Sequence, residues 1–306
     1  MIVFTKLNLK ERINLCLFCQ SLADLVYMVE NFLLYADRVY IEIMGAARRG
    51  PLFKLLLDNH LNGFYGFNSA SGFMTTVIAC ERCFCVVSPL KSQSILKTKS
   101  MLVIIVVAFI VIVGVFFVVC TRWSIKCVFD PRTNTSMPEI YPGQFYLLNK
   151  QLIDTLDGYV YGIILPVSFI FLVSISTIIT VVHLRKMASW REQSSTATAG
   201  SAAMMVRDVA LTRMLIGCSM LFIVCNIPVV VFRALIVFVP EVSLGGRYQN
   251  MFTFMVSVTE LFGYINSSCN FFIYYSMGTK YKQALNALCL CCRRRDGTKP
   301  RSTVQA

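Results

Sequence analysis

Long apolar stretches alternate with short charged ones along most of the chain. Four stretches contain no Asp, Glu, Lys or Arg: Leu61–Cys80, Met101–Thr121, Gly158–Val182 and Met214–Phe232. Each approaches or exceeds the roughly 20 residues that a helix needs to cross the hydrocarbon of a bilayer. This pattern predicts membrane-spanning helices.

Two further stretches, 13–36 and 248–277, are apolar except for Asp24, Glu30 and Glu260. Ionisable groups inside a span face the interior of a helix bundle rather than lipid. We therefore expect an all-α, polytopic transmembrane helix bundle of six spans. The expected bounds are about 13–36, 58–87, 100–121, 157–184, 207–239 and 248–277.

The composition agrees with a membrane domain. Hydrophobic residues make up 56% of the chain and charged residues 15%, which is too apolar for one soluble core. After the last span, apolar residues recur at helical spacing among basic ones, which predicts a short amphipathic membrane-surface helix over 279–290. We thus expect a membrane domain over 1–290 and a disordered tail over 291–306.

Basic residues indicate the orientation of the bundle. The net charge is +13, and most of the 29 Lys and Arg lie at the two chain ends and in the loops that follow the second and fourth spans. By the positive-inside rule, both ends are cytoplasmic in a multi-pass plasma-membrane protein. The charge then reflects topology and attraction to anionic membrane lipid, and we expect no nucleic-acid partner. The sequon Asn134-Thr135-Ser136 falls in an outer loop and predicts glycosylation at Asn134.

An adjacent acid and base, Glu81 and Arg82, close the second apolar run. A charge pair at the end of a span is costly and needs a physical reason. One interpretation is a switch, in which a carboxylate holds Arg82 in one state and releases it to an intracellular partner in another. The other is a membrane-boundary ion pair that only anchors the helix.

Motifs along nearly the whole chain share one family pattern. They are Ser21-Leu22-Ala23-Asp24-Leu25, Glu81-Arg82-Cys83 with Pro89-Leu90, Phe222 with Cys225-Asn226-Ile227-Pro228, and Asn270-Phe271-Phe272-Ile273-Tyr274 followed by Tyr281. In this order and spacing they resemble the helix signatures of rhodopsin-like (class A) G-protein-coupled receptors, of the invertebrate peptide or chemosensory orphan type.

The resemblance implies seven spans, so the six expected here correspond to the second through the seventh. Met1-Ile2-Val3-Phe4 looks like the last turn of an apolar element. We expect an amino-terminally incomplete receptor or gene model, with a genuine six-helix variant as the alternative.

The resemblance also implies the coupling residues. Arg82 is expected to insert toward a heterotrimeric G protein, with Glu81 as its same-helix carboxylate and Asp208 as a lock from another helix. Asp208 lies about 30 Å before Pro228 at the helical rise of roughly 1.5 Å per residue, which places it at the inner end of its span. The alternative is a solvated Asp208 that pairs with Arg207 or Thr212. Further expected coupling residues are Pro89, Leu90 and Tyr274.

An aspartate in mid-membrane needs partners. For Asp24 the resemblance supplies an oxygen-rich cage similar to the sodium site of these receptors, made by Ser71, Asn266, Ser267 and Asn270. Hard cations prefer such ligands. The alternative is a structural hydrogen-bond network around a protonated Asp24. No other cofactor is expected.

The chain departs from the family pattern at several positions. Cys83 replaces a tyrosine, Asn226 a toggle tryptophan and Phe271 a proline. Leu57 stands where the partner of the outer-loop Cys127 is expected, so the usual outer disulfide cannot form. Three cysteines follow the surface helix, Cys289, Cys291 and Cys292. We expect them to be palmitoylated, and the alternative is that they are plain reduced thiols.

The ligand site is expected at the outer half of the bundle. Helix phase and depth select as candidates Asn31, Tyr35, Phe64, Tyr65, Asn68, Tyr161, Arg233, Glu260 and Tyr264. Arg233 and Glu260 either pair with each other or meet the charged groups of a peptide ligand. Because no aspartate lies near Phe64, a biogenic amine is disfavoured, and a neuropeptide or another chemosensory ligand remains.

Other function classes fit poorly. A six-span channel lacks an arginine-rich voltage-sensor helix and a pore loop, and a transporter lacks inverted repeats. An enzyme is not expected, because His60 and His183 lie far apart at opposite membrane faces. A receptor that couples an outer ligand to G-protein activation is the main prediction, and a non-signalling truncated receptor is the alternative.

Overall fold

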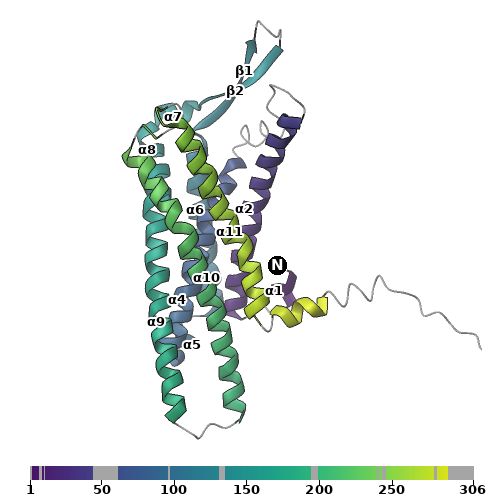
Figure 1. Cartoon of the computed structure of the whole chain (residues 1–306), viewed down its shortest axis with the longest axis vertical. Coiled ribbons are helices and arrows are strands. Elements are labelled where there is room, and N and C mark those ends of the chain that lie inside the picture. The colour runs from purple at the N-terminus through teal and green to yellow at the C-terminus, as the bar shows by residue number, and fades with distance from the viewer. Residues whose placement is uncertain are drawn as a thin grey trace, which may run out of the picture.

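The computed structural model describes residues 2–6, 9, 11–43, 61–95, 97–130, 135–193, 199–239, 241–242, 246–278 and 281–288. Long helices run roughly side by side along the molecule (Figure 1). They are α2 (Arg12–Ile43), α4 (Gly66–Val87), α6 (Thr98–Cys120), α9 (Leu165–Gln193), α10 (Ala199–Phe238) and α11 (Gln249–Met277). The expected all-α polytopic bundle is confirmed.

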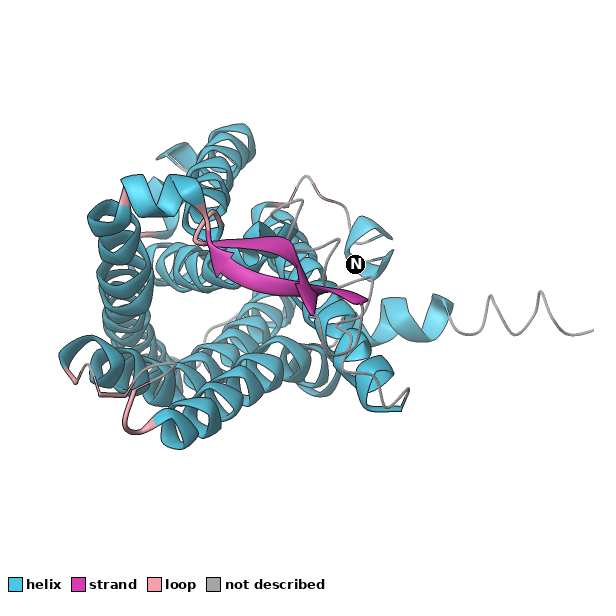
Figure 2. Cartoon of the chain, turned by 90° about the horizontal axis from the view of Figure 1, so that it is seen from above, coloured by secondary structure: helices cyan, strands magenta, loops and turns pink. Residues whose placement is uncertain are grey.

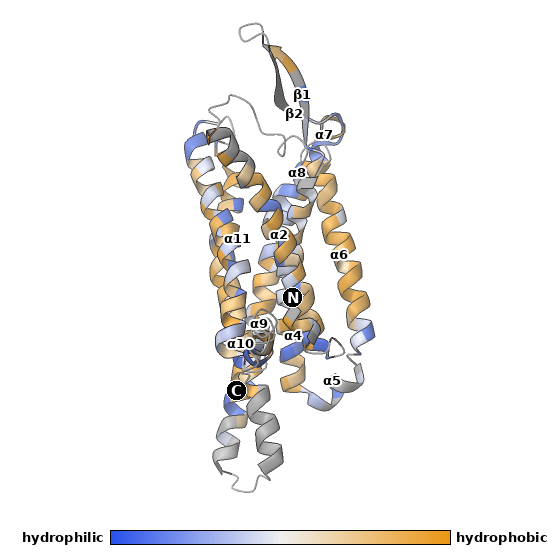
Figure 3. Ribbon diagram, turned by 90° about the vertical axis from the view of Figure 1, so that its right-hand side faces the viewer, coloured by the Kyte–Doolittle hydropathy of each residue, from blue (hydrophilic) through white to orange (hydrophobic). Residues whose placement is uncertain are grey.

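The long helices carry the apolar surface that a bilayer requires. In the described part of the chain, 5 stretches are long and apolar enough to cross a membrane, in α2, α4, α6, α9 with the segment before it, and α10. Figure 3 shows apolar residues along most of α6, whose side chains face mostly outward. The remaining long helix, α11, packs against α10 and α2. The protein is therefore a multi-pass membrane protein.

Short elements complete the bundle. They are α1 (Ile2–Lys6), the 3-10 helix η1 (Leu61–Tyr65), α5 (Pro89–Ile95), α7 (Gln144–Leu148), α8 (Lys150–Asp154) and the π-helix η2 (Thr155–Ile164). Residues 281–288 form a further helix, whose Tyr281, Ala284, Leu285 and Leu288 pack on the core. Where the sequence predicts a span over 13–36, α2 continues to Ile43.

A β-hairpin projects from one end of the bundle, which we call the hairpin end (Figure 1). Strands β1 (Trp123–Asp130) and β2 (Thr135–Pro142) pair antiparallel, with Trp123 opposite Pro142. Figure 2 shows the hairpin lying over the bundle. The sequence, with its prolines, indicated only a long loop here. In a two-stranded sheet each strand is an edge strand, where a proline that lacks an N–H group is tolerated.

Helix α9 begins immediately after the π-helical turns of η2. Pro166 has no N–H group to donate to the carbonyl of Gly162, four residues earlier. A wider helical turn before a proline is one way for the chain to continue past the missing hydrogen bond. Pro166 thus directly follows a π-helix, whereas Pro228 lies inside the continuous helix α10.

Helix α4 connects the parts of the bundle. It contacts α2, α6, α9 and α10, and it extends from the hairpin end to the opposite end, which we call the Arg82 end. Gly72 in its middle allows Phe169 and Phe222 to approach closely, since a Cβ there would lie 3.2 Å and 3.4 Å from their rings. A shift of α4 is therefore felt directly by α9 and α10.

Candidate functional site

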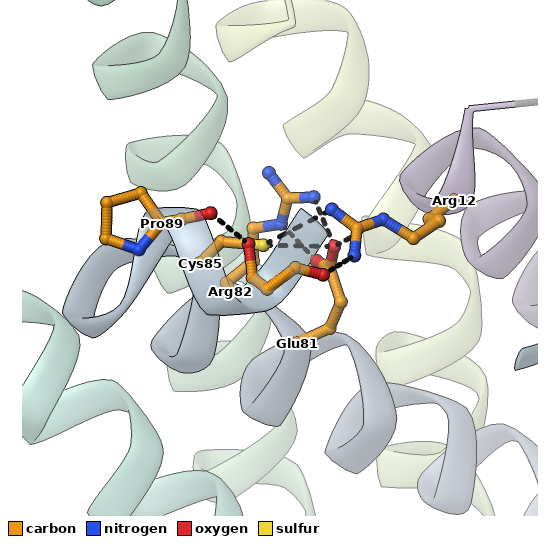
Figure 4. Close-up of polar contacts among 6 residues, drawn as sticks. Arg12, Glu81, Arg82, Cys85 and Pro89 are labelled. Atoms are coloured by element: carbon orange, nitrogen blue, oxygen red, sulfur yellow. Dashed lines mark hydrogen bonds and ion pairs between the residues drawn. The ribbon is translucent and has the colours of Figure 1, made fainter. Parts of the chain in front are cut away.

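At the Arg82 end, Arg82 is bound by its neighbour in sequence. Its Nε lies 2.5 Å from Glu81 Oε2, and its Nη2 lies 2.9 Å from Oε1 (Figure 4). The carboxylate of Glu81 is buried, whereas the guanidinium of Arg82 is partly exposed. This pairing fits both the switch and the membrane-boundary anchor, so the switch and the G protein's contact with Arg82 stay predictions.

A second arginine approaches the same carboxylate from α2. Arg12 Nε lies 3.9 Å from Glu81 Oε1, and Arg12 Nη1 donates to the carbonyl of Ser92 in α5 at 2.8 Å. Figure 4 shows the side chains of Arg12 and Arg82 converging on Glu81. Arg12 thus links α2, α4 and α5 at this end. The sequence analysis treated it only as one of the basic residues that set the topology.

Of the other expected coupling residues, the structure describes contacts for Pro89 and Tyr274. The carbonyl of Pro89 accepts a hydrogen bond from Ser92 Oγ at 2.9 Å, at the start of α5. Tyr274 is buried and donates to Gln20 Oε1 at 3.3 Å, while its ring packs edge-on against Phe4. The side chains of Leu90 and Asp208 lie outside the described residues, so the lock from α10 stays a prediction.

In the middle of the bundle, three residues surround the carboxylate of Asp24. Ser71 Oγ donates to its Oδ1 at 2.6 Å, Ser267 Oγ to the same atom at 3.1 Å, and Asn270 Nδ2 to its Oδ2 at 3.3 Å. Asp24 is 7% exposed. The cage therefore joins α2, α4 and α11, as the sequence prediction requires. Asn266 is buried, but no hydrogen bond joins it to Asp24 within the described residues.

The donor set fits a monovalent cation. One carboxylate and the two hydroxyl oxygens of Ser71 and Ser267 are ligands that a hard cation prefers, whereas Asn270 presents its Nδ2 to the carboxylate. In the described ranges no three His, Cys, Asp or Glu gather at one point, so a site rich in carboxylates is not formed there. The same hydrogen bonds also satisfy Asp24 without an ion, so sodium stays a prediction.

Toward the hairpin end, two adjoining cavities lie between α4, η2, α9, α10 and α11. The larger encloses about 580 Å³ including its open mouth, and the other about 380 Å³. Both are lined by Tyr65, Asn68, Asn226, Val229 and Arg233. Three of these residues, Tyr65, Asn68 and Arg233, are among the ligand residues expected from the sequence, whereas Asn226 is only a departure from the family pattern.

Four other expected ligand residues form a seam between α2 and α11. Tyr35 Oη donates to Glu260 Oε2 at 2.6 Å, and Tyr264 Oη donates to Asn31 Oδ1 at 3.0 Å. Glu260 and Arg233 form no ion pair in the described part of the chain. Their mutual pairing, one of the two interpretations from sequence, is therefore absent from this structure.

The last two expected ligand residues differ in position. Tyr161 lines the larger cavity, and its hydroxyl donates to the carbonyl of Ile112 in α6 at 2.5 Å. Phe64 packs edge-on against Phe117 and is 37% exposed. Phe64 is not part of the lining of either cavity.

An ion cluster that the sequence analysis missed closes the hairpin end of α6. Arg122 donates to Asp157 Oδ2 at 2.7 Å and to Asp154 Oδ1, and its guanidinium lies over the ring of Tyr146. Burial and the neighbouring Asp154 carboxylate raise the pKa of Tyr146, so its hydroxyl keeps its proton and donates to Asp154. We call these four residues the Arg122 cluster. No periodicity marks them, because they come from different short elements.

Several expected modification sites lie outside the described residues. They are Asn134 and the three cysteines Cys289, Cys291 and Cys292, so glycosylation and palmitoylation stay predictions. The side chain of Cys127 is likewise not described, while Cys120 is a free thiol.

Comparison with known proteins identifies a family over almost the full length. The family model described as "Serpentine type 7TM GPCR chemoreceptor Srw" matches residues 1–292. No curated protein matches the chain. The prediction of a G-protein-coupled receptor is confirmed, whereas the finer assignment to the class A peptide type stays a prediction.

Proposed function

Because the chain belongs to the serpentine 7TM GPCR chemoreceptor family Srw, we propose that it binds a small extracellular ligand in the two cavities and activates a heterotrimeric G protein at the Arg82 end. The observation that carries the proposal is the course of α4. Asn68 lines both cavities, and Glu81 follows 13 residues later on the same helix, about 20 Å away at roughly 1.5 Å per residue. One rigid element thus joins a ligand site to the Arg82 switch.

The orientation of the bundle is part of the proposal. The hairpin end faces the outside, and the Arg82 end, with the carboxyl terminus, faces the cytoplasm, as the distribution of Lys and Arg supports. The protein is then placed in the plasma membrane, and residues 281–288 lie at its inner lipid surface. The cavities then lie in the half of the bundle that is nearer the outside.

Signalling follows from the two ends that α4 connects. A ligand that contacts α4 and α10 more favourably in one arrangement shifts the population toward that arrangement. A change in the angle between these helices alters the surroundings of Glu81 and weakens its hold on Arg82. Arg82 then becomes available to a G protein.

The type of ligand follows from the family. The matching family model describes chemoreceptors. A chemosensory small molecule is therefore preferred to the neuropeptide that the sequence leaves open. We further propose that the Asp24 cage binds sodium and stabilises the paired state.

The proposal is tested by nucleotide exchange. The full chain is reconstituted in nanodiscs with a panel of purified heterotrimers, and GTPγS uptake is measured in the wild type, Arg82→Gln and Lys97→Gln. Lys97 is an exposed lysine near the same end of the bundle, so its substitution removes equal charge. We expect exchange above the receptor-free rate in the wild type and Lys97→Gln and its loss in Arg82→Gln. Equal exchange in the presence and absence of receptor for every heterotrimer contradicts the proposal.

A further inference from the structure

Arg233 is the basic residue common to both cavities. It lines each of them from α10, together with Tyr65 and Asn68 on the facing side. The two cavities therefore meet at Arg233. A ligand in either cavity lies near its positive charge.

The charge of Arg233 is not compensated by the described residues. No ion pair or hydrogen bond joins its guanidinium to a described residue. The acid that lines the larger cavity, Asp157, is already held by Arg122 at 2.7 Å, and Glu260 accepts from Tyr35 at 2.6 Å. The guanidinium of Arg233 therefore has no direct partner among the described residues, and a partly buried cation without a partner favours an anionic ligand.

The backbone of η2 positions the stem of Arg233. A Cβ at Gly162 would lie 3.6 Å from Arg233 Cβ and 3.7 Å from Cδ, so the aliphatic stem packs against a surface without a side chain. A packed stem loses less rotational freedom when the guanidinium binds an anion. The rest of the larger cavity offers the aromatic rings of Phe116 and Phe169.

We propose that the ligand is a small carboxylic acid, whose carboxylate binds Arg233 and whose apolar body lies against the aromatic lining. The planar guanidinium matches a carboxylate in a bidentate arrangement. A dianion such as a phosphate monoester leaves one charge uncompensated, and an amine meets a like charge. The inference rests on the proposed ligand site, but it does not depend on coupling to a G protein.

Chemical labelling tests the inference without a G protein. The purified full chain in nanodiscs is treated with phenylglyoxal, which modifies accessible arginine, and peptide mass spectrometry gives the rate at each site. Arg122, held by two carboxylates near the same end, is the internal control. We expect faster modification at Arg233 than at Arg122. Millimolar benzoate is expected to slow labelling of Arg233, whereas benzyl alcohol and benzylamine leave its rate unchanged.

Variants of Arg233 distinguish loss of its positive charge from loss of the folded structure. We expect benzoate to raise the thermal unfolding midpoint of the wild type and of Arg233→Lys, and to leave that of Arg233→Gln unchanged. Apparent benzoate affinity is expected to fall at least about tenfold in Arg233→Gln. Lys97→Gln, which removes a positive charge from an exposed position at the Arg82 end, should keep the response. Absence of protection by benzoate, or equal protection by benzyl alcohol or benzylamine, overturns the inference even if the receptor activates a G protein.

Discussion

Arg82 and Glu81 are consecutive residues of α4, yet two nitrogen atoms of Arg82 contact both carboxylate oxygens of Glu81, at 2.5 Å and 2.9 Å. Consecutive side chains of a helix leave it about 100° apart and do not face each other. The long stem of Arg82 therefore has to turn back along the helix surface. A contact of this kind is easily replaced when another partner for Arg82 arrives.

Removal of the carboxylate should raise basal activity. In Glu81→Gln, Arg82 loses its charged partner and is more often available to a G protein. We expect basal GTPγS exchange to rise by up to about tenfold, since about 1.4 kcal/mol corresponds to a factor of ten. Arg12→Gln should change the rate in the opposite direction, because Glu81 then loses its second cation and keeps Arg82 and the neutral thiol of Cys85 as partners. An increase in both variants would show that Arg12 only stabilises the fold.

The Asp24 cage predicts an effect of sodium on stability. If sodium binds the folded bundle, it should stabilise it over choline by about 1.4 kcal/mol at roughly ten times its dissociation constant. The unfolding midpoint in sodium chloride and in choline chloride measures this difference. Asp24→Asn should abolish it, whereas Thr76→Val should keep it, because Thr76 bonds only the carbonyl of Gly72. A sodium effect that survives in Asp24→Asn leaves the cage a purely structural network.

Gly263 in α11 allows close approach of α2. A Cβ at this position would lie 2.6 Å from Tyr27 Oη and 3.5 Å from its Cζ, and Tyr27 is 1% exposed. Gly263→Ala should therefore destabilise the bundle by about 1–3 kcal/mol. Tyr27→Phe removes the clashing oxygen, so the double variant should be as stable as Tyr27→Phe alone.

The control for these variants of Gly263 and Tyr27 is Gly114→Ala in α6, where a Cβ meets no atom within 4 Å. Alanine is the better helix former, so this change should be neutral or stabilise by up to about 1 kcal/mol. Thermal unfolding of the variants in detergent measures all the differences. Additive effects of Gly263→Ala and Tyr27→Phe would contradict the contact between the two residues.

Substitution of Glu30, unlike that of Gly263, is expected to stabilise the protein. Both its carboxylate oxygens are buried, and neither has a hydrogen-bond partner among the described residues. Glu30→Met removes the cost of this buried group and should stabilise the protein by about 1–3 kcal/mol. Glu260→Met should destabilise it, because Glu260 has a partner in Tyr35. A less stable Glu30→Met would indicate that Glu30 binds an ion or ligand.

The long helices were predictable because hydropathy and charge mark where a span begins and ends. Lysines before α6 and Arg122 after it bracket the helix Thr98–Cys120, close to the expected 100–121. The extension of α2 to Ile43 was not predictable, because hydropathy marks only the part of a helix that crosses hydrocarbon. The β-hairpin was also missed, because Pro138 and Pro142 are typical of loops unless a strand has no second neighbour.

Sequence reasoning found the residues of the site that carry a family motif. The structure brings Asp24, Ser71 and Asn270 together, as expected from the resemblance. The contacts of Arg12 with Glu81 and of Arg122 with Asp157 were not predicted from the sequence. These pairs join segments far apart in the chain, and no spacing in one sequence indicates which charges meet.

The Arg122 cluster attaches the base of the hairpin to α8 and η2 through charges, between residues 32 and 35 positions apart. Ions in the medium screen partly exposed charges over distances of about 10 Å at 0.1 M, and acid neutralises carboxylates. Reducing agents leave such a contact intact. The hairpin end, beside the larger cavity that Asp157 lines, is therefore held by a contact whose strength follows the salinity and acidity of the medium.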